Sequence, residues 1–277
     1  MIDLRFDYRG GTICIVSPSE HDEIARSIQQ RRTFYEFDVL ERCEWYLATL
    51  RRHGGTILDI GAFTGNHTVF FASFCQASEV LAFEPCRASF AMLEQTILRN
   101  QLKNTRAFNV AIAEKSGFGS ITVRDAANLG ANRLQSCDAA ASDAVPVADL
   151  DAFLKSIGAG NESIVLVKID VEGMETEVLT GAQETLRRSR PVLCIEILDA
   201  QHMRRVSGIF GRLRYLIREC NGAAPTYIAT YEVRPAFLVR LLNLGWLVLA
   251  YCGTNAWRWR YRRLLEILFP PRVLQNN

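Results

Sequence analysis

The sequence contains no C-x-x-C pair, although it has eight cysteines. They are scattered along the chain, and several lie in apolar runs, as Cys194 does in Val192-Leu-Cys-Ile195. Cysteine pairs at short spacing indicate zinc or redox sites, and a regular cysteine framework in a small secreted chain indicates disulfides. The scattered pattern instead favours buried, reduced thiols in a cytoplasmic protein.

Signals for export and for membrane insertion are also missing. The segment Met1-Ile-Asp-Leu-Arg-Phe6 lacks the charged-then-apolar layout of a signal peptide. The longest apolar stretch, from Phe237 to Cys252, includes Arg240 and Asn243 and is too short and too polar to span a bilayer. We find no internal repeat. With 277 residues, we expect one large domain with appendages in the cytoplasm.

Charge is unevenly distributed, although the formal net charge is only +2. Residues 201–277 contain twelve arginines and three acids, a local charge of +9, which leaves −7 for residues 1–200. Such a basic part binds an anionic partner, packs against the acidic body or forms a solvated face. The tail Arg258-Trp-Arg-Tyr-Arg-Arg263 suits an anionic membrane on the cytoplasmic side.

Apolar periodicity predicts strands alternating with helices, which is typical of a doubly wound, mostly parallel sheet. We predict a β-hairpin over 2–16, helical structure over 20–52 with a break near 33–37, and a surface loop over 125–146. The predicted strands are 57–61, 80–84, 106–112, 119–124, 164–170, 191–197, 226–233 and 246–251. The predicted helices are 66–74, 87–100, 150–157, 176–188, 203–219, 235–244 and 257–269. The predicted parts are a hairpin and helical cap (1–53), the main domain (54–256) and a basic aromatic tail (257–277).

One glycine turn carries most of the functional information. The segment Ile57-Leu-Asp-Ile-Gly-Ala-Phe-Thr-Gly-Asn66 runs from an apolar strand through Gly61 and Gly65 into a helix. Three residues separate these glycines, so this is not the G-x-G-x-x-G dinucleotide fingerprint. The D-x-G-x-x-x-G pattern that starts at Asp59 is the one that an S-adenosylmethionine (SAM) pocket uses. For an isolated motif, a structural glycine turn is the alternative.

Further cofactor contacts are expected at the ends of neighbouring strands. Glu84 ends the strand 80–84, where a carboxylate can accept both ribose hydroxyls; its alternative role is an acid at a helix N-terminus. Tyr35-Glu36 is expected to cover the cofactor, and residues 109–112 are expected to lie against the adenine. The predicted cofactor-binding residues are Glu36, Asp59, Gly61, Ala62, Gly65, Asn66, Glu84, Pro85, Asn109, Val110 and Ala111.

Acidic residues follow the buried strand 164–170, in Lys168-Ile-Asp-Val-Glu-Gly-Met-Glu175. Alternation along an extended chain would put Asp170 and Glu172 on one side, where one of them acts as general base. Alternatively, Asp170 and Glu196 hold one Mg²⁺ ion through oxygen ligands. His67 and His202 are minor candidates for the base, since a lone histidine more often packs or caps.

Six blocks in this order resemble the FkbM family of SAM-dependent methyltransferases over roughly residues 34–198. They are Leu58-Asp-Ile-Gly-Ala62, Phe83-Glu-Pro85, Val147-Ala-Asp-Leu-Asp151, Lys168-Ile-Asp-Val-Glu-Gly173, Glu177-Val-Leu-Thr-Gly-Ala182 and Arg190-Pro191 through Glu196. The resemblance implies the Rossmann-like class I methyltransferase sheet of seven strands, with the seventh antiparallel, and Leu244-Gly-Trp246 through Tyr251 resembles its closing pair. It also implies O-methylation of sugars, glycolipids or polyketides. Phe63 departs from the usual Gly-Ala-Asn, and Asn66 lies one turn on.

The leading hypothesis is therefore SAM-dependent methylation of a hydroxyl on a sugar, a glycolipid or polysaccharide precursor, or a secondary metabolite. A second hypothesis, motivated by Phe63, is a non-catalytic SAM-binding or scaffold protein. A third, motivated by the basic aromatic tail, is a nucleic-acid methyltransferase. The acidic body and the missing Asn/Asp-Pro-Pro-Tyr motif count against the third.

Overall fold

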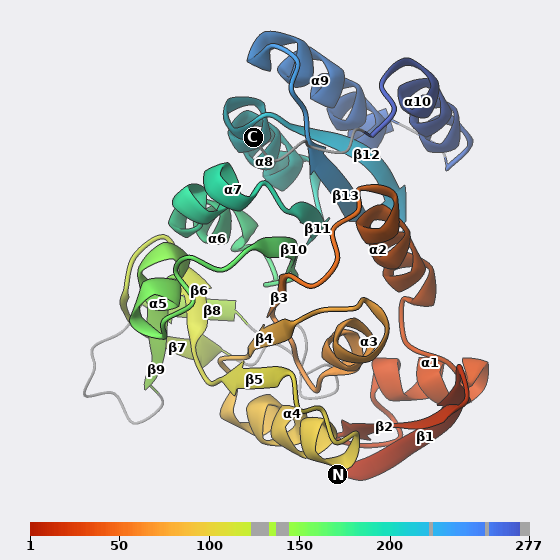
Figure 1. Ribbon diagram of the computed structural model, residues 1–277, viewed down its shortest axis with the longest axis vertical. Coiled ribbons are helices and arrows are strands. Elements are labelled where there is room, and N and C mark those ends of the chain that lie inside the picture. The colour runs from red at the N-terminus through yellow and green to blue at the C-terminus, as the bar shows by residue number, and fades with distance from the viewer. Residues whose placement is uncertain (123–132, 137–143, 222–223, 253–254, 272–277) are drawn as a thin grey trace.

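The computed structural model describes residues 1–122, 133–136, 144–221, 224–252 and 255–271 (Figure 1). The strands are β1 (Ile2–Tyr8), β2 (Gly11–Ser17), β3 (Thr56–Ile60), β4 (Glu79–Phe83), β5 (Thr105–Phe108), β6 (Ala111–Ala113), β7 (Gly117–Thr122), β8 (Arg133–Ser136), β9 (Ala144–Asp149), β10 (Ile164–Ile169), β11 (Val192–Glu196), β12 (Tyr215–Asn221) and β13 (Thr226–Tyr231). The helices are α1 (Glu23–Arg31), α2 (Phe37–Thr49), α3 (Asn66–Phe74), α4 (Arg87–Arg99), α5 (Leu150–Ser156), α6 (Glu175–Gly181), α7 (Gln183–Ser189), α8 (Ala200–Leu213), α9 (Ala236–Cys252) and α10 (Asn255–Leu268).

The central element is a seven-stranded sheet with the order β12-β13-β11-β10-β3-β4-β5. Strands β11, β10, β3, β4 and β5 pair in parallel, and β13 runs antiparallel to both of its neighbours. Alternate residues of the strands enter two cores. Leu58 and Ile60 face the core formed with α5 to α8, and Ile57 faces the core formed with α2 and α3. The predicted doubly wound, mostly parallel sheet is confirmed.

The predicted N-terminal hairpin and the two helical segments that follow it are also confirmed. β1 and β2 form an antiparallel hairpin, and α1 and α2 are separated near residues 32–36. Phe34 packs edge-to-face against Phe6, Tyr8 and Phe70, so the hairpin shares one apolar cluster with α3. The division of the chain into three parts stays a prediction.

A second sheet was not anticipated. It has four strands in the order β6-β9-β7-β8. The predicted strand 106–112 is in fact two strands, β5 and β6, which belong to different sheets. The prediction of a loop over 125–146 is wrong where β8 and the start of β9 lie, and the rest of that segment lies outside the described residues. An Ala- and Ser-rich composition therefore hid strands whose partners are distant in sequence.

The C-terminal predictions need two corrections. The helix predicted over 203–219 ends at Leu213, because Arg214 adopts a left-handed conformation (φ 61°) and β12 begins at Tyr215. The strand predicted over 246–251 is wrong, since α9 continues through it to Cys252. The Asn243 side chain bonds the backbone of Tyr215 and Ile217, and Trp246 Nε1 donates to the carbonyl of Ile217. The closing antiparallel pair is β12–β13, and α9 packs along it. The predicted basic C-terminal helix corresponds to α10.

The close approach of α6 to β6 yields a stability prediction. A Cβ on Gly181 would lie 2.1 Å from the carbonyl oxygen of Ala113, whereas a Cβ on Gly208 of α8 would meet nothing within 4 Å. We expect Gly181→Ala to lower the free energy of unfolding by about 1–3 kcal/mol, the usual cost of overpacking. The matched control Gly208→Ala should be neutral or stabilising by up to about 1 kcal/mol. Urea denaturation measures both, and equal stability of the two variants would contradict the close packing.

Candidate functional site

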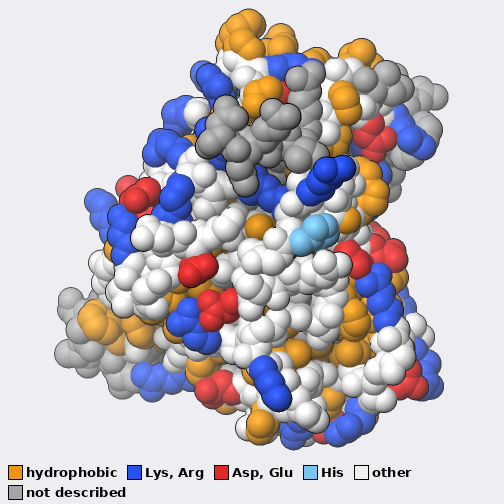
Figure 2. Space-filling model, viewed as in Figure 1, with side chains coloured by type: hydrophobic (Ala, Val, Ile, Leu, Met, Phe, Trp, Pro, Cys, Tyr) orange, Lys and Arg blue, Asp and Glu red, His pale blue; other side chains and the backbone are white. Residues whose placement is uncertain are grey.

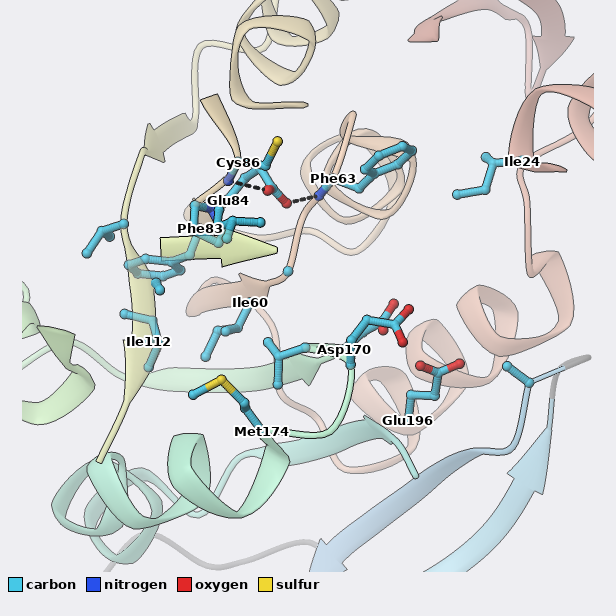
Figure 3. Close-up of a pocket in the computed structure, with 18 of the residues that line it drawn as sticks. Ile24, Ile60, Phe63, Phe83, Glu84, Cys86, Ile112, Asp170, Met174 and Glu196 are labelled. Atoms are coloured by element: carbon cyan, nitrogen blue, oxygen red, sulfur yellow. Dashed lines mark hydrogen bonds between the residues drawn. The ribbon is translucent and has the colours of Figure 1, made fainter. Parts of the chain in front are cut away.

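A cavity of about 440 Å³ opens at the carboxyl ends of β3, β4, β10 and β11 (Figure 3). From β3 the chain moves outward through β4 to β5, and it then returns to β10 on the other side of β3. Such a topological switch point is where open α/β sheets bind their ligands. The fold therefore places a cavity at the position that the glycine turn predicts.

The turn after β3 requires glycine at its first position. Gly61 has φ +80°, and a Cβ there would lie 1.8 Å from the carbonyl oxygen of Asp170. The amides of Gly61 and Ala62 both donate to the carbonyl of Phe83. Phe63 is also left-handed, with φ 49°. Asparagine tolerates this conformation better than a bulky residue, which gives a physical reason for the Asn that the family usually carries here.

Glu84 lines the cavity and is held by backbone amides. Its carboxylate accepts from Phe63 N at 2.9 Å and from Cys86 N at 2.8 Å (Figure 3). Burial raises the pKa of Glu84 to about 7, and the two backbone hydrogen bonds oppose that rise. Glu84 thus faces the cavity from a fixed position, as a ribose-binding acid would.

Lys168 lies buried beneath the cavity floor. Its Nζ donates to the carbonyl of Gly61 at 2.6 Å and lies 3.4 Å from both Asp59 Oδ1 and Asp170 Oδ2. Burial alone would lower the pKa of Lys168, but Asp170 and Asp59 raise it above its ordinary value. The ammonium therefore stays charged. Lys168 was not predicted as a site residue, although period-two alternation places its side chain on the same side of the strand as Asp170.

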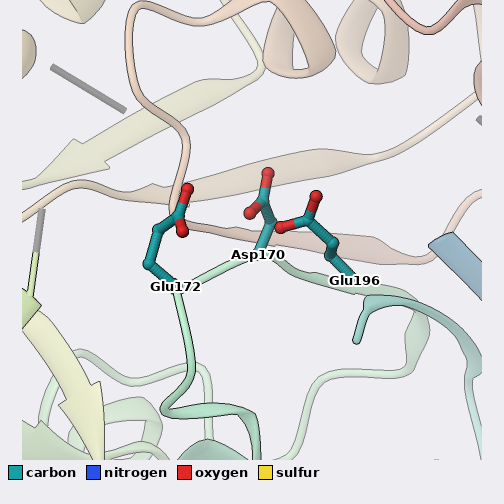
Figure 4. Close-up of side chains that lie close together, drawn as sticks. All are labelled: Asp170, Glu172 and Glu196. Carbon is teal, nitrogen blue, oxygen red and sulfur yellow. The ribbon is translucent and has the colours of Figure 1, made fainter. Parts of the chain in front are cut away.

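Three carboxylates gather at the ends of β10 and β11. Oxygen atoms of Asp170, Glu172 and Glu196 lie within 4.8 Å of one another (Figure 4). Glu196 hydrogen-bonds Asp170, and burial together with Asp170 raises the pKa of Glu196. Burial would raise the pKa of Asp170 too, but Lys168 and Glu196 hold it below its ordinary value. Glu196 is therefore the protonated partner and Asp170 the ionised one.

Asp170 and Glu172 both line the cavity, as predicted, but the expected reason is wrong. β10 ends at Ile169, and Glu172 is left-handed with φ 54°, so the segment is not an extended chain with period two. A turn through Gly173 brings the two carboxylates together instead.

Glu36 also lines the cavity, from the N-cap of α2 in a left-handed conformation (φ 51°). Burial and the nearby Asp170 raise the pKa of Glu36 to about 7. His67 Nε2 lies 3.6 Å from Glu36 Oε2. Burial and Lys168 lower the pKa of His67 to about 4, so its imidazole is neutral at pH 7. His67 lies behind Glu36 and outside the cavity lining.

Some predicted cofactor residues form the frame of the cavity rather than its lining. Asp59 accepts from Thr68 Oγ1 at 2.6 Å, and Asn66 bonds the backbone N and O of Tyr35. Asn109 Nδ2 donates to the carbonyls of Glu84 and Pro85. Ala62 is buried, and Gly65 packs against α4. These residues hold the walls in place.

The remaining predicted cofactor residues line the cavity: Glu36, Gly61, Glu84, Pro85, Val110 and Ala111. His202 does not line it; its ring bonds Asp199. Tyr35 and Ile112, which were expected to lie beside the cofactor, also line the cavity. Lining residues that were not predicted include Glu23, Ile24, Phe63, Phe83, Cys86, Ile121, Val171, Met174 and Ala224. Strand ends can be located from sequence, but the side chains that turn inward from α1 and β7 cannot.

The lining is strongly acidic. Among the described residues it includes Glu23, Glu36, Glu84, Asp170, Glu172 and Glu196, and no lysine, arginine or histidine. Apolar side chains from β4, β6 and β7 form the rest of one wall. The cavity therefore combines an apolar slot with carboxylates held at defined positions.

Comparison with known proteins identifies the family of this chain. The family model "Methyltransferase FkbM domain" matches residues 59–221. A methyltransferase FkbM structure from Methylobacillus flagellatus is 17% identical, with a TM-score of 0.48, over 64% of this chain and 44% of that one. The chain thus spans less than half the length of that structure. No curated protein matches the sequence.

Two other solved structures are similar to this chain. A precorrin-6y C5,15-methyltransferase from Geobacter metallireducens is 12% identical, with a TM-score of 0.44, over 69% of this chain and 88% of that one. A structure named StiE O-MT is 8% identical, with a TM-score of 0.47, over 79% and 81% of the two chains.

The Rossmann-like methyltransferase fold points to SAM as the cofactor. Because the family model covers more than half of the chain and contains the strands that build the cavity, the chain belongs to the FkbM methyltransferase family.

Proposed function

We propose that this methyltransferase transfers a methyl group from SAM to a hydroxyl of a sugar, a glycolipid or polysaccharide precursor, or a secondary metabolite. The observation that carries the proposal is one cavity that contains both a backbone-anchored Glu84 and, apart from it, the cluster around Asp170. When bound, SAM supplies an electrophilic methyl group on a sulfonium centre. The protein's own residues bind, orient and accept a proton.

The residues at the Glu84 end fit a nucleoside. Glu84 offers carboxylate oxygens to ribose hydroxyls, and Phe83, Val110 and Ile112 form an apolar wall for an adenine ring. The absence of a side chain at Gly61 leaves the backbone open to a ligand. These residues would hold the cofactor so that its reactive end points toward Asp170.

At the Asp170 end of the cavity, each carboxylate has a different role, which depends on whether it is protonated at neutral pH. Glu36 has a pKa of about 7, which matches a general base at neutral pH better than Asp170, whose pKa is held low. Glu36 accepts the hydroxyl proton, ionised Asp170 orients that hydroxyl, and Glu172 provides a further acceptor. Correct positioning of the two reactants then supplies much of the rate acceleration.

The acidic lining also restricts the acceptor. A phosphate or carboxylate group on the acceptor would meet Glu23, Glu172 and the ionised Asp170 with no cation of the described lining to pair with it. Neutral polyols donate hydrogen bonds to carboxylates without this repulsion. We therefore favour an uncharged sugar over a phosphorylated one, with an amine-bearing acceptor as the runner-up.

The same carboxylates raise the question of Mg²⁺, which prefers oxygen ligands. The lysine ammonium of Lys168 already lies 3.4 Å from Asp170, and Glu196 shares a proton with that carboxylate. A divalent ion would have to displace this proton and compete with Lys168. We therefore propose that Lys168 balances the cluster and that catalysis proceeds without a metal ion.

The first test is calorimetric titration with SAM and S-adenosylhomocysteine. Replacing Glu84 removes charge-assisted hydrogen bonds worth about 1.5–3 kcal/mol, so Glu84→Gln should weaken binding by about 10- to 100-fold. The matched control is Glu79→Gln at the start of β4, the strand that Glu84 follows, and the Glu79 carboxylate pairs with Arg106 outside the cavity lining. Its affinity should equal that of the wild type. Absence of SAM binding by folded wild-type protein would mean that Phe63 has closed the site, and a non-catalytic scaffold would become the leading hypothesis.

A second test compares Glu36→Gln with Asp170→Asn in an acceptor screen that uses radiolabelled SAM. Since the raised pKa of Glu36 is about 7, its base form appears above that pH, and the wild-type rate should rise through pH 7 and then level off. Glu36→Gln should remove this limb and lower the plateau by about 10²- to 10⁴-fold. Asp170→Asn should lower the rate and keep SAM affinity, and it should move the limb to lower pH, because the Asp170 charge no longer raises the pKa of Glu36. Full activity of Asp170→Asn would disprove its catalytic role.

Metal dependence has a direct test that needs no acceptor. Thermal unfolding of the wild type with added MgCl₂ or with EDTA should give the same midpoint, because Lys168 and the shared proton already satisfy Asp170. A midpoint that rises with Mg²⁺ in the wild type but not in Asp170→Asn would instead establish a metal site at Asp170 and Glu196.

A further inference from the structure

An apolar stripe on α9 faces away from the rest of the molecule. Phe237, Leu241 and Leu244 have exposed fractions of 73%, 60% and 44%. Their spacing, i, i+4 and i+7, puts them on one side of the helix. The opposite side is buried, where Val239 and Trp246 enter the core. A helix of a soluble domain normally buries its apolar stripe, so a second stripe in solvent calls for a partner.

Exposed arginines lie on α9 and on the neighbouring helix α8. Arg240 lies on α9 itself, and Arg204, Arg205 and Arg212 lie exposed on α8. The two helices pack side by side, since a Cβ on Gly211 would lie 3.2 Å from Cβ of Arg240. Figure 2 shows hydrophobic side chains at the upper end of the molecule, over α9, with basic side chains near them.

Several other arginines of this region are paired with acids. Arg218 and Arg234 pair with Glu232, and Arg262 pairs with Glu219 and Glu266. Within the described part of the chain, no salt bridge involves Arg204, Arg205, Arg212 or Arg240. Their positive charge therefore suits an anionic partner.

We propose that the stripe and the four arginines, together called the α9 surface, bind the face of an anionic lipid bilayer. Apolar side chains enter the interface while neighbouring cations pair with lipid headgroups, as in interfacial amphipathic helices. A second copy of the chain fits less well, because a two-fold contact would bring the same arginines together. A nucleic acid would use the arginines but has no place for Leu241 and Leu244.

The membrane contact proposed here lies on α9, whereas the sequence suggested the tail 257–277. None of the helices in the described residues is long and apolar enough to cross a membrane. The contact is therefore peripheral, with α9 lying in the plane of the interface. This inference is independent of the proposed acceptor and of the carboxylate cluster.

Co-sedimentation of the full chain with vesicles tests the proposal. The wild type should bind vesicles that contain phosphatidylserine and should not bind pure phosphatidylcholine, and added salt should weaken the binding. The double variant Phe237→Ser/Leu241→Ser should lower the partition coefficient at least about 10-fold. Arg212→Glu/Arg240→Glu should lower it at least as much.

A matched control is Leu98→Ser on α4, which removes an equally exposed leucine (69%) elsewhere. It should bind vesicles like the wild type, and far-ultraviolet circular dichroism should show all variants folded. Equal binding to both lipid compositions, or no vesicle binding at all, would overturn the proposal. So would light scattering that shows a wild-type dimer which Phe237→Ser/Leu241→Ser converts to a monomer. RNA binding by the wild type without vesicle binding would overturn it as well.

Discussion

The buried ammonium of Lys168 is the interaction on which the cavity depends. A buried charge is costly unless it is paired, and Lys168 finds its partners on three separate segments. These are Asp59 on β3, the carbonyl of Gly61 in the turn, and Asp170 at the end of β10. The pairing fixes the glycine turn against the next parallel strand. It also determines protonation around it, because Lys168 keeps Asp170 ionised, and ionised Asp170 keeps a proton on Glu196.

Much of the fold could be predicted because its first half is encoded in local patterns. From β3 to β11, short apolar runs ending in glycine or acid alternate with amphipathic segments, and the boundaries of β3, β4, β7, β10 and β11 fall within a residue or two of expectation. The predicted strand 106–112 instead divides into β5 and β6, and β8 and β9 were not predicted. Farther along, the patterns are ambiguous. Tyr215–Asn221 continues the apolar period of α8, and only the left-handed Arg214 separates helix from strand. The apolar run after Asn243 is compatible with either a strand or a buried helix. It forms a helix that packs on β12, where Asn243 accepts a hydrogen bond from the backbone of Ile217.

The site shows the same division between local and tertiary information. The sequence located strand ends, and so Gly61, Glu84 and Asp170 were predicted where they lie. It could not tell which neighbours turn into the cavity. Asn66 and Asn109 offered amides suited to a ligand, yet both satisfy backbone groups of the walls. Such wall residues are needed because buried polar backbone must be hydrogen-bonded.

Phe63 stands where the FkbM family usually has Asn, and this difference is the main reason to doubt that the cavity binds SAM. The geometry explains why the Glu84 end of the cavity can still bind the cofactor. What Glu84 needs from position 63 is the backbone N–H, which every residue except proline supplies. The left-handed backbone conformation of Phe63 costs about 1–2 kcal/mol, because its Cβ crowds the neighbouring carbonyl oxygen. Hydrogen bonds donated by the backbone amides of Gly61, Ala62 and Phe63 hold the turn in this conformation. Because the Phe63 side chain reaches the cavity wall, the substitution changes the shape of that wall rather than the anchoring of Glu84. Because the cavity wall changes shape while Glu84 keeps its backbone hydrogen bonds, we expect Phe63 to alter how a ligand fits and not to abolish the cofactor pocket.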